Sequence, residues 1–559
     1  MGAGKVKLVV RHSSPFNFLL TIHVSGKNLA VLFNDAAGCF DQIPPTLAEV
    51  ALQSVGVSRS ATKMHTTAQR SMKHYIKTSL GVSKGYIKFN RVQKHIIWNG
   101  IIMLLMGLIG GVGQGGGSSP IIWMVILIIL LDAYKLTQKG AQVWDCVKKE
   151  GIDLHVISYV DDNSIVRHFD RDTQLQQMLN GIRDNLWEWH KLLQLTGCDL
   201  SLGKCQVTIM KWVQEGEWGE LNLVKKNKHP GTVQISSILD KETKVTLGRL
   251  DPTEAERVLG IRLPLSGGME HEHKFRKKQL DDFGTKLYNA PLTHYEAYSA
   301  FRSCYLTIAS YPYTVTTFTT KELQQIQQRP LQKILPKLGI NRNTPRAVIF
   351  GPRDLSGRQL TDLRVEQPVK NYTATLGHLR RQDKVSLLLM ATLNDLQVEV
   401  GISTAFYNHN PKDYKYITQN TRWGYTWNMV WEFEMKLEID GIWTPKQKYQ
   451  NDRNIMEVAM QDAKYQDRNR YKLQTINQCR LYQEAFYIGD LADSTGSTIP
   501  IEFLNGKGKH KHEEISFPDM VAPTQLQWNK WKTLIFRNFL TVGQKCSILN
   551  WVKRLQTMM

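Results

Sequence analysis

The amino-acid sequence predicts an α+β fold in which an antiparallel sheet packs against helices and is followed by mainly helical regions. Three observations predict it. Residues 152–158 and 163–167 are short, β-branched and roughly alternating runs, typical of two strands joined by a tight turn. Residues 29–33 form a continuous apolar run, as expected of a buried strand. From residue 270 to about 338, apolar residues recur at helical spacing.

The predicted strand at 29–33 runs on to a carboxylate, Asp35. If this strand lies beside the predicted hairpin, Asp35 faces Asp161 across neighbouring strands. Carboxylates placed in this way are able to clamp two metal ions about 3.5–4 Å apart. The alternative is that Asp35 caps a helix that begins at Ala36 or later, which is a common role for Asp.

The tip of the predicted hairpin carries two adjacent carboxylates, Asp161 and Asp162, directly after Tyr159 and Val160. A hairpin tip holds its side chains in place and leaves them exposed. Hard oxygen ligands of this kind favour Mg²⁺ or Mn²⁺ over Zn²⁺. The alternative is an ordinary polar turn, because Asp is frequent in turns.

Between the two acidic sites, residues 111–120 form a glycine-rich loop that leads into an apolar helix from Ile121 to about Leu131. Glycines let a backbone approach a ligand closely, and the helix start that follows favours phosphate. The loop lacks the Lys-Ser/Thr pair of a phosphate-binding P-loop, and a flexible linker is the alternative. We expect no membrane span, because each apolar run here is shorter than the ~20 residues that cross a bilayer.

The remaining elements follow from local patterns. Pro44 and Pro45 open the first helical region, since Pro is well tolerated at a helix start. The expected elements are helices to about Leu80, an amphipathic helix near 173–195, a return strand at about 206–212, a loop or β-rich insertion at 215–252, and helices near 455–491.

Basic residues recur within the predicted helices that follow residue 270. Arg329, Lys333 and Lys337 are spaced four apart, so they are able to share one helical face. Pro330 and Pro336 are expected to break any long helix there. The cluster at 273–278 is expected to form a solvated basic face.

The composition favours a polyanionic partner. Lys and Arg number 71 against 50 acidic residues, a formal net charge of +21, and such a field attracts nucleic acid in a salt-dependent way. The seven cysteines include no CxxC pair, which indicates neither a zinc knuckle nor a disulfide framework. With no contiguous apolar signal region near Met1, the expected location is intracellular, in the cytoplasm or the nucleus.

Several of these features together resemble, in order and spacing, the palm motifs of reverse transcriptases. The segments that match are Asp35 with Phe40 and Asp41, Gln114 and Gly115 with Ser119 and Pro120, Tyr159 to Asp162, and Gly197–Cys205 with Lys204. Leu259 and Gly260 stand where a primer-grip hairpin is expected. The resemblance covers about residues 25–265, and residues 311–352 are weakly similar to the region after the palm in non-LTR retroelement polymerases.

The resemblance implies a role for each matching residue. Asp35 and Asp161 would ligate Mg²⁺ or Mn²⁺, with Asp162 as a weaker or structural partner. Lys204 would stabilise charge near the leaving pyrophosphate, although a solvated surface lysine is the alternative. Three further residues would bind the nucleotide: Phe40 beneath its sugar, to select deoxynucleotides, and Gln114 and Gly115 along the nucleotide and template pocket.

The resemblance also implies an architecture and a function. The architecture is a right-hand polymerase palm with incomplete fingers, a helical thumb and a mixed, mainly helical C-terminal region. The domains are 1–28, residual fingers; 29–265, palm with partial fingers; 266–400, thumb or connection; and 401–559, of unassigned role. The implied function is an RNA-directed DNA polymerase of a retrotransposon, with an RNA template, a DNA primer and deoxynucleoside triphosphates as partners.

Two alternatives remain beside the enzyme. The first is a truncated, catalytically inactive polymerase-like protein that binds nucleic acid, because only a short segment precedes Asp35 where fingers would be expected. The second is a membrane-associated protein built on the apolar runs between 96 and 131.

Overall fold

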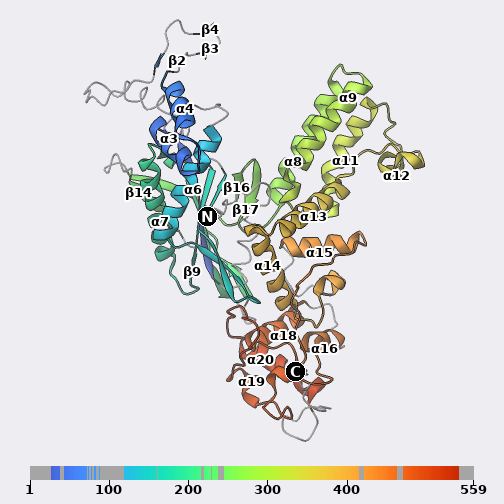
Figure 1. Cartoon of the computed structure of the whole chain (residues 1–559). Helices are drawn as coiled ribbons and strands as arrows, with labels where there is room; N and C mark the ends of the chain where they lie inside the picture. The colour runs from blue at the N-terminus through green and yellow to red at the C-terminus, as the bar shows by residue number, and fades with distance from the viewer. Residues whose placement is uncertain are drawn as a thin grey trace.

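The structure is a computed structural model with a mixed α+β fold (Figure 1). The residues it describes are 27–37, 43–71, 73–74, 77–78, 81–82, 87–88, 119–159, 162–215, 220–227, 230–236, 244–414, 421–462 and 470–540. The statements below concern these residues.

A mainly antiparallel sheet forms the centre of the N-terminal half. Its strand order is β14-β15-β11-β1-β9-β8, and β10 pairs with the end of β1 beyond β11. Only the β11–β15 pair among these is parallel. The strands are β1 (Asn28–Ala37), β8 (Val156–Tyr159), β9 (Asp162–Phe169), β10 (Asp199–Leu200), β11 (Gln206–Met210), β14 (Val233–Ser236) and β15 (Lys244–Leu250). The predicted buried strand, hairpin and return strand are therefore present.

The first arm of the predicted hairpin is divided in two. The sequence predicted one strand over 152–158, whereas β7 (Glu150–Leu154) pairs with β6 (Ala141–Asp145) and only β8 pairs with β9. The β6–β7 turn is held by Asp145, whose carboxylate accepts hydrogen bonds from the backbone N–H groups of Val147 and Lys148. Alternation of side chains marks a strand but does not identify its partner, so the division at His155 was not predictable.

Helices cover one face of the sheet. They are α3 (Pro45–Ser54), α4 (Arg59–Ser71), α6 (Ser119–Thr137) and α7 (Leu175–Leu195), drawn on one side of the strands in Figure 1. Ala30, Leu32 and Ala36 of β1 are buried in one cluster with residues of α3, α6 and α7. The amphipathic helix predicted at 173–195 is therefore confirmed. The first predicted helical region consists of two helices, but it ends at Ser71, so the expectation of helices to about Leu80 is wrong for Lys73–His74 and Lys77–Thr78, which are strands. Short strands β2 to β5 (Lys73–His74, Lys77–Thr78, Gly81–Val82, Ile87–Lys88) follow α4.

Helix α6 is longer than the sequence predicted. It spans 19 residues rather than ending near Leu131, so the expectation that neither apolar run approaches the length of a bilayer-crossing helix is wrong for this one. By length and composition it is the one such helix in the described part of the chain. Its residues Ile122, Trp123 and Ile126 are buried against the sheet, as expected for a core helix.

The chain then forms an insertion and a helical region. Two hairpins, β12 (Trp212–Glu215) with β13 (Glu220–Leu223) and β16 (Ala255–Val258) with β17 (Ile261–Pro264), show that the region after 212 is rich in strands. The helical region consists of α8 (Glu270–Asn289), α9 (His294–Ala300), the π-helical turn η2 (Phe301–Tyr305), α10 (Leu306–Ser310), the turn η3 (Tyr311–Thr314), α11 (Thr320–Lys337) and α12 (Arg346–Phe350).

Helix α11 runs through both prolines that were expected to break it. Its start is held by a capping box in which Thr319 and Glu322 bond each other's backbone N–H. Pro330 packs against Gly284 of α8 so closely that a Cβ at Gly284 would lie 3.0 Å from the Pro330 Cα. We attribute the continuity of α11 to this close helix packing, which offsets the hydrogen bond that an interior proline removes.

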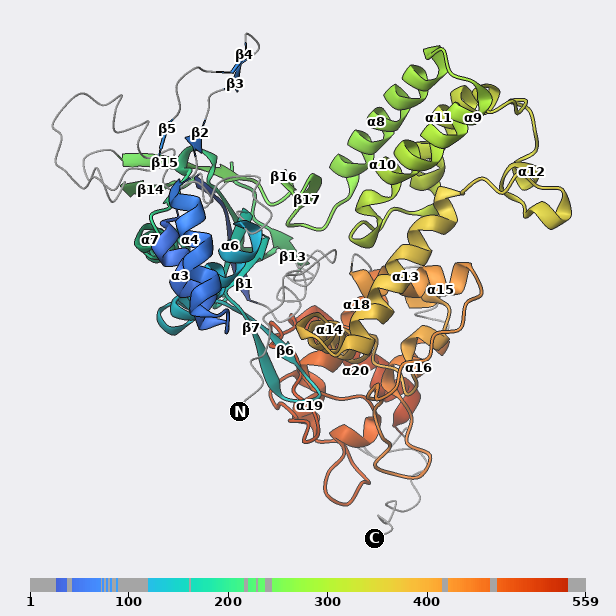
Figure 2. The ribbon, with the colours of Figure 1, turned by 45° about the horizontal axis from the view of Figure 1, so that its top comes forward.

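The C-terminal half is mainly helical, as predicted. It contains α13 (Leu363–Arg381), α14 (Lys384–Val400), α15 (Arg422–Glu432), α16 (Ile455–Gln461), α18 (Arg470–Tyr482), α19 (Ile501–Asn505) and α20 (Gln525–Phe539), with short 3₁₀ turns between them. Figure 2 shows α14, α18 and α20 close to the β6–β7 hairpin. One buried cluster joins Val31 and Val166 of the sheet to residues of α14 and α20.

Candidate functional site

The pairing of β1 with β9 places two acidic residues opposite each other. Asp35 is the direct cross-strand partner of Asp162 in this antiparallel ladder. Such partners project on the same face of a sheet, with Cβ atoms about 4.5–5.5 Å apart. The sequence predicted that Asp35 would face Asp161, and this residue lies outside the described residues. The Asp35–Asp161 contact therefore stays a prediction, and Asp162 is the observed partner.

The alternation of β1 shows which face carries the acidic pair. Leu29, Val31 and Phe33 are buried in the cluster that includes the C-terminal helices, while the residues between them face α6 and α7. Asp35 continues the first set, since successive strand residues alternate between faces. The acidic pair therefore lies on the sheet face that α6 and α7 do not cover.

Lys204 contacts Asp35. It lies in the 3₁₀ turn η1 (Leu202–Lys204), between β10 and β11, and its Nζ is 2.6 Å from the Asp35 Oδ2. The Lys204 side chain is 72% exposed and that of Asp35 is 22% exposed. Lys204 is therefore solvated, as the surface-lysine alternative expected, and its ammonium contacts the Asp35 carboxylate. Its role near a leaving pyrophosphate stays a prediction.

The segment that carries Lys204 is held in place on both sides. The backbone N–H of Ser201 donates to the Asp35 carbonyl oxygen at 2.9 Å. Asp199 of β10 is hydrogen-bonded to the buried His190 of α7. Burial acts to raise the pKa of Asp199, but the bonds from His190 and from the Leu200 N–H outweigh it and lower that pKa. An ionised Asp199 therefore ties this segment to α7.

The primer-grip candidates form the turn of the β16–β17 hairpin. Val258 pairs with Ile261, and Leu259 and Gly260 between them have φ of 51° and 81°. Two consecutive left-handed residues are the geometry of a tight, right-twisted hairpin turn. The turn is fixed from outside, since the Tyr311 hydroxyl donates to the Leu259 carbonyl at 2.6 Å.

A buried ion pair supports the same turn. Arg276 and Glu272 of α8 are buried and bonded to each other. Arg276 also donates to the Gly260 carbonyl at 3.3 Å, and Glu272 accepts the Arg262 N–H at 2.8 Å. The expectation that residues 273–278 form a solvated basic face is therefore wrong for Arg276. The contacts of Arg276 are with Glu272, four residues earlier, and with the turn at Gly260, sixteen residues earlier.

Glu256 is a neighbour of the acidic pair that sequence reasoning missed. Burial raises the pKa of Glu256, and the negative charge of Asp162 raises it further. Glu256 of the β16–β17 hairpin therefore lies within electrostatic reach of Asp162. The available signal was that Glu256 stands three residues before Leu259, in the hairpin already singled out.

Other predicted residues divide into two groups. Phe40, Gln114 and Gly115 lie outside the described residues, so their roles stay predictions. Lys333 and Lys337 do lie on one face of α11, but they contact α8 rather than forming a free basic surface. The Lys333 Nζ is 2.6 Å from an oxygen of Asp281, and the Lys337 Nζ donates to the Ala290 carbonyl at 2.7 Å.

The donor set at the acidic pair fits a hard divalent cation. Asp35 already has a cation, the Lys204 ammonium, against one carboxylate oxygen, and Asp162 stands directly across the strand. Carboxylate oxygens are the ligands that Mg²⁺ and Mn²⁺ prefer. Within the described ranges, no group of three acidic, His or Cys side chains gathers in a metal-binding arrangement. The predicted third carboxylate, Asp161, lies outside those ranges.

Comparison with known proteins shows a structural likeness to a solved structure. No family model matches the chain, and no curated protein matches it. Among solved structures, the chain is similar to telomerase from Candida albicans, determined in complex with a TWJ fragment of telomeric RNA, with a TM-score of 0.21 and 12% identity. The match covers 66% of this chain and 52% of that one, so the chain spans about half the telomerase length. At this TM-score the likeness carries no argument about function.

Proposed function

We propose that this chain is a reverse-transcriptase-type nucleotidyltransferase, an RNA-directed DNA polymerase of a retrotransposon. The reaction joins a deoxynucleotide to the 3′-hydroxyl of a DNA primer on an RNA template, and pyrophosphate leaves. The observation that carries the proposal is the register that sets Asp35 against Asp162, with the Lys204 ammonium on Asp35. These residues come from three segments that the sequence had already singled out.

Asp35, Asp161 and Asp162 would hold the Mg²⁺ or Mn²⁺ ions. Bound there, the ions supply charge stabilisation for the attacking and leaving oxygens of a phosphoryl transfer. Asp162 is exposed and Asp35 is partly exposed, so both carboxylates are accessible to a substrate phosphate.

Lys204 adds a positive charge beside this carboxylate pair. Phosphoryl transfer depends mainly on positioning and on electrostatic stabilisation of the charge that develops. In this proposal Lys204, whose side chain is 72% exposed, exchanges Asp35 for the pyrophosphate of a bound nucleotide. In this proposal Phe40 lies beneath the sugar, and Gln114 and Gly115 line the nucleotide and template pocket.

The β16–β17 turn would position the primer. Leu259 and Gly260 are held by Tyr311 and Arg276 through their carbonyl oxygens. Glu256 of the same hairpin is within electrostatic reach of Asp162, whose negative charge adds to the rise in the pKa of Glu256 that burial causes. A rigid turn is suited to holding a primer 3′ end, because reacting atoms must be placed to within about 3–3.5 Å.

Primer extension on an RNA template with Mg²⁺ or Mn²⁺ tests the proposal. The wild-type chain is expected to add deoxynucleotides, and Asp161→Asn and Asp35→Asn are expected to abolish addition while still binding primer–template. Asp354→Asn, an exposed acidic residue of the turn η4 (Arg353–Leu355), is the matched control and should retain activity. A wild-type chain that binds primer–template in a salt-sensitive way but never extends it would instead support the inactive, nucleic-acid-binding alternative.

A further inference from the structure

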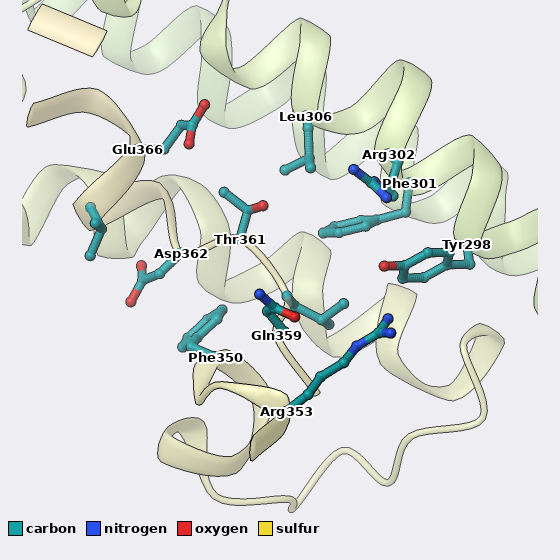
Figure 3. A pocket seen from close by; sticks show the side chains of 12 residues that line it. Tyr298, Phe301, Arg302, Leu306, Phe350, Arg353, Gln359, Thr361, Asp362 and Glu366 are labelled. Carbon is teal, nitrogen blue, oxygen red and sulfur yellow. The ribbon is translucent and has the colours of Figure 1, made fainter. Parts of the chain in front are cut away.

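A cavity of about 650 Å³ lies in the helical region, away from the acidic pair. It opens between the α9–α10 stretch and the segment that links α12 to α13. In both ribbon views α12 lies on the side of α8 and α11 that faces away from the sheet (Figures 1 and 2). The side chains that matter here are Tyr298, Phe301, Arg302, Phe350, Arg353 and Gln359, shown in Figure 3.

The cavity carries two positive charges that its own acidic residues do not neutralise. Arg302 and Arg353 are exposed, and neither makes an ion pair or side-chain hydrogen bond within the described residues. The two acidic residues of the lining are already engaged. Asp362 is paired with Arg364 at 2.6 Å, and Glu366 lies 3.4 Å from the Lys370 Nζ. The free charge in this cavity is therefore positive, which favours an anionic ligand.

Aromatic rings stand beside the two guanidinium groups. Tyr298 and Phe350 are partly buried at the cavity wall, and Figure 3 shows the Arg353 side chain extending toward Tyr298. Phe301 is buried and stacks on Tyr305, with ring centroids 5.1 Å apart. Aromatic faces next to arginines are suited to a ligand that has a flat ring and a phosphate, since rings stack and guanidinium binds phosphate bidentately.

One wall of the cavity is a short π-helix. Phe301 and Arg302 belong to η2, the π-helical turn between α9 and α10. Single π-helical turns inside α-helices are uncommon and often lie at functional sites.

The opposite wall is a strained but well-anchored loop. Gln359 and Ser356 have φ of 53° and 61°, a left-handed backbone conformation that non-glycine residues rarely adopt. The loop is held by backbone bonds from Arg358 N to Val348 O at 2.7 Å and from Leu360 N to Ile349 O at 3.0 Å. The wall is therefore preformed, as in most small-molecule sites, and the cavity volume falls in their range of about 300–1,000 Å³.

We propose that this cavity binds a nucleotide unit, either a free nucleoside phosphate or one nucleotide of a single strand. The phosphate contacts Arg302 and Arg353, and the base lies against Tyr298 and Phe350. A nucleotide is favoured over an acidic peptide because the lining combines arginines with aromatic rings, and because the whole chain carries a net charge of +21. The proposal does not depend on polymerase activity, since no lining residue belongs to the acidic pair or the β16–β17 turn.

Fluorescence anisotropy of the full chain with a labelled short single-stranded RNA tests this inference. Excess unlabelled primer–template duplex is present, so that the site at the acidic pair is already occupied. We expect the double variant Arg302→Gln/Arg353→Gln to bind the RNA roughly tenfold more weakly. The slope of log affinity against log salt concentration should become shallower by about one, which corresponds to the loss of one phosphate contact. Tyr298→Leu, which keeps an apolar side chain against the core, should weaken binding about fivefold or more, whereas Tyr298→Phe should retain it.

The matched control is the double variant Arg358→Gln/Arg380→Gln. It removes the same charge from two arginines that do not line the cavity. If this control loses as much affinity as the cavity variant, binding reflects only the overall charge and the proposal is overturned. It is also overturned if a poly-glutamate peptide binds through Arg302 and Arg353 while RNA does not.

Competition separates the two sources of the ligand. AMP and ATP are titrated against the labelled RNA, in the wild-type chain and in Asp35→Asn. Displacement by AMP or ATP assigns the cavity to a free nucleotide, and displacement only by unlabelled single strand assigns it to a nucleic-acid segment. Displacement of either kind in Asp35→Asn supports a nucleotide site separate from the acidic pair. Failure of the polymerase proposal would instead appear only as an absence of activity in the primer-extension assay.

Discussion

At the scale of single residues, the Lys204–Asp35 contact links the fold to the proposed chemistry. The two atoms are 2.6 Å apart, and the residues are 169 positions apart in the chain. An exposed ion pair of this kind contributes little to stability, typically about 0–1 kcal/mol. The contact therefore matters mainly because it places the Lys204 ammonium beside the Asp35 carboxylate.

We predict that Lys204→Ala slows nucleotide addition without weakening primer–template binding. Loss of one stabilising charge in a phosphoryl transfer is expected to lower the rate about 10²-fold. Single-turnover incorporation and a separate binding titration measure the two effects, and Lys204→Arg should restore part of the rate because it keeps the charge. An unchanged rate in Lys204→Ala, with or without weaker binding, would show that Lys204 is only a surface cation.

Asp452 is a buried carboxyl whose titration should affect stability. It is 4% exposed, and its Oδ1 accepts the Gly489 N–H at 3.1 Å, while its Oδ2 has no hydrogen-bond partner among the described residues. Burial raises the pKa of Asp452 to about 8 in the folded chain, against about 3.9 in an unfolded one. The folded state thus holds a proton that the unfolded state releases between those two values.

We predict that folding stability falls as pH rises from about 4 to about 8, and that Asp452→Asn weakens this dependence. Below the unfolded pKa both states are protonated and the contribution is fully present; above about pH 8 it is lost. Urea unfolding midpoints between about pH 5 and 8 measure the slope, with the exposed Asp354→Asn as control. Parallel slopes for Asp452→Asn and the wild type would contradict the assignment.

At the scale of elements, the close contact of α8 with α11 explains a proline-containing helix. Gly284 leaves no space between the helices, since a Cβ there would lie 3.0 Å from the Pro330 Cα and 3.3 Å from the Pro330 Cβ. The Cα is a backbone atom and the Cβ belongs to the proline ring, so neither atom can move aside by a side-chain rotation. The helix pair that would form the thumb therefore depends on the absence of one side-chain carbon.

We predict that Gly284→Ala destabilises the chain by about 1–3 kcal/mol, because overpacking forces the helices apart. Gly377→Ala is the matched control, since Gly377 lies inside α13 and a Cβ added there would meet nothing within 4 Å. Helix propensity alone should make that control more stable by about 0.5–1 kcal/mol. Thermal unfolding compares the two, and a Gly284→Ala variant as stable as the control would mean that the contact is looser than described.

At the scale of the whole molecule, one buried cluster joins the sheet to the C-terminal helices. Val31 of β1 and Val166 of β9 belong to it, as do Leu393 of α14 and Trp531 of α20. Polar contacts reinforce the junction, for example Asn394 to Asp145 at 3.1 Å and Ser516 N to the Cys146 carbonyl at 2.8 Å. The region 401–559 therefore supports the sheet face that carries Asp35, and its proposed domain boundary stays a prediction.

We predict that removing residues 401–559 loosens β1 and β9 as well as the helices that remain. The deletion exposes apolar residues of the cluster, including Val31 and Val166, that the C-terminal helices help to bury. Hydrogen exchange of the β1 and β9 amides in the full and shortened chains measures the effect. Unchanged protection of these strands would show that the sheet is stable without the C-terminal region.

By itself, the sequence determined the local features of this protein. Period-two and apolar runs predicted β1, the β8–β9 hairpin and β11, and helical spacing predicted α7 and the region from α8 to α11, because such periodicity depends only on near neighbours. The sequence also singled out Asp35, Asp162 and Lys204. It could not show that these three meet, since their contacts join segments more than one hundred residues apart.

Tertiary structure alone decided the rest. It set the register of Asp35 against Asp162, buried Arg276 behind the β16–β17 turn, and let α11 continue through Pro330 by close packing on Gly284. It also brought Arg302 and Arg353 to one cavity from segments about fifty residues apart in sequence. Each of these outcomes depends on which surfaces pack together in the folded chain. The packing energy is shared between distant residues and is not encoded in any one local pattern.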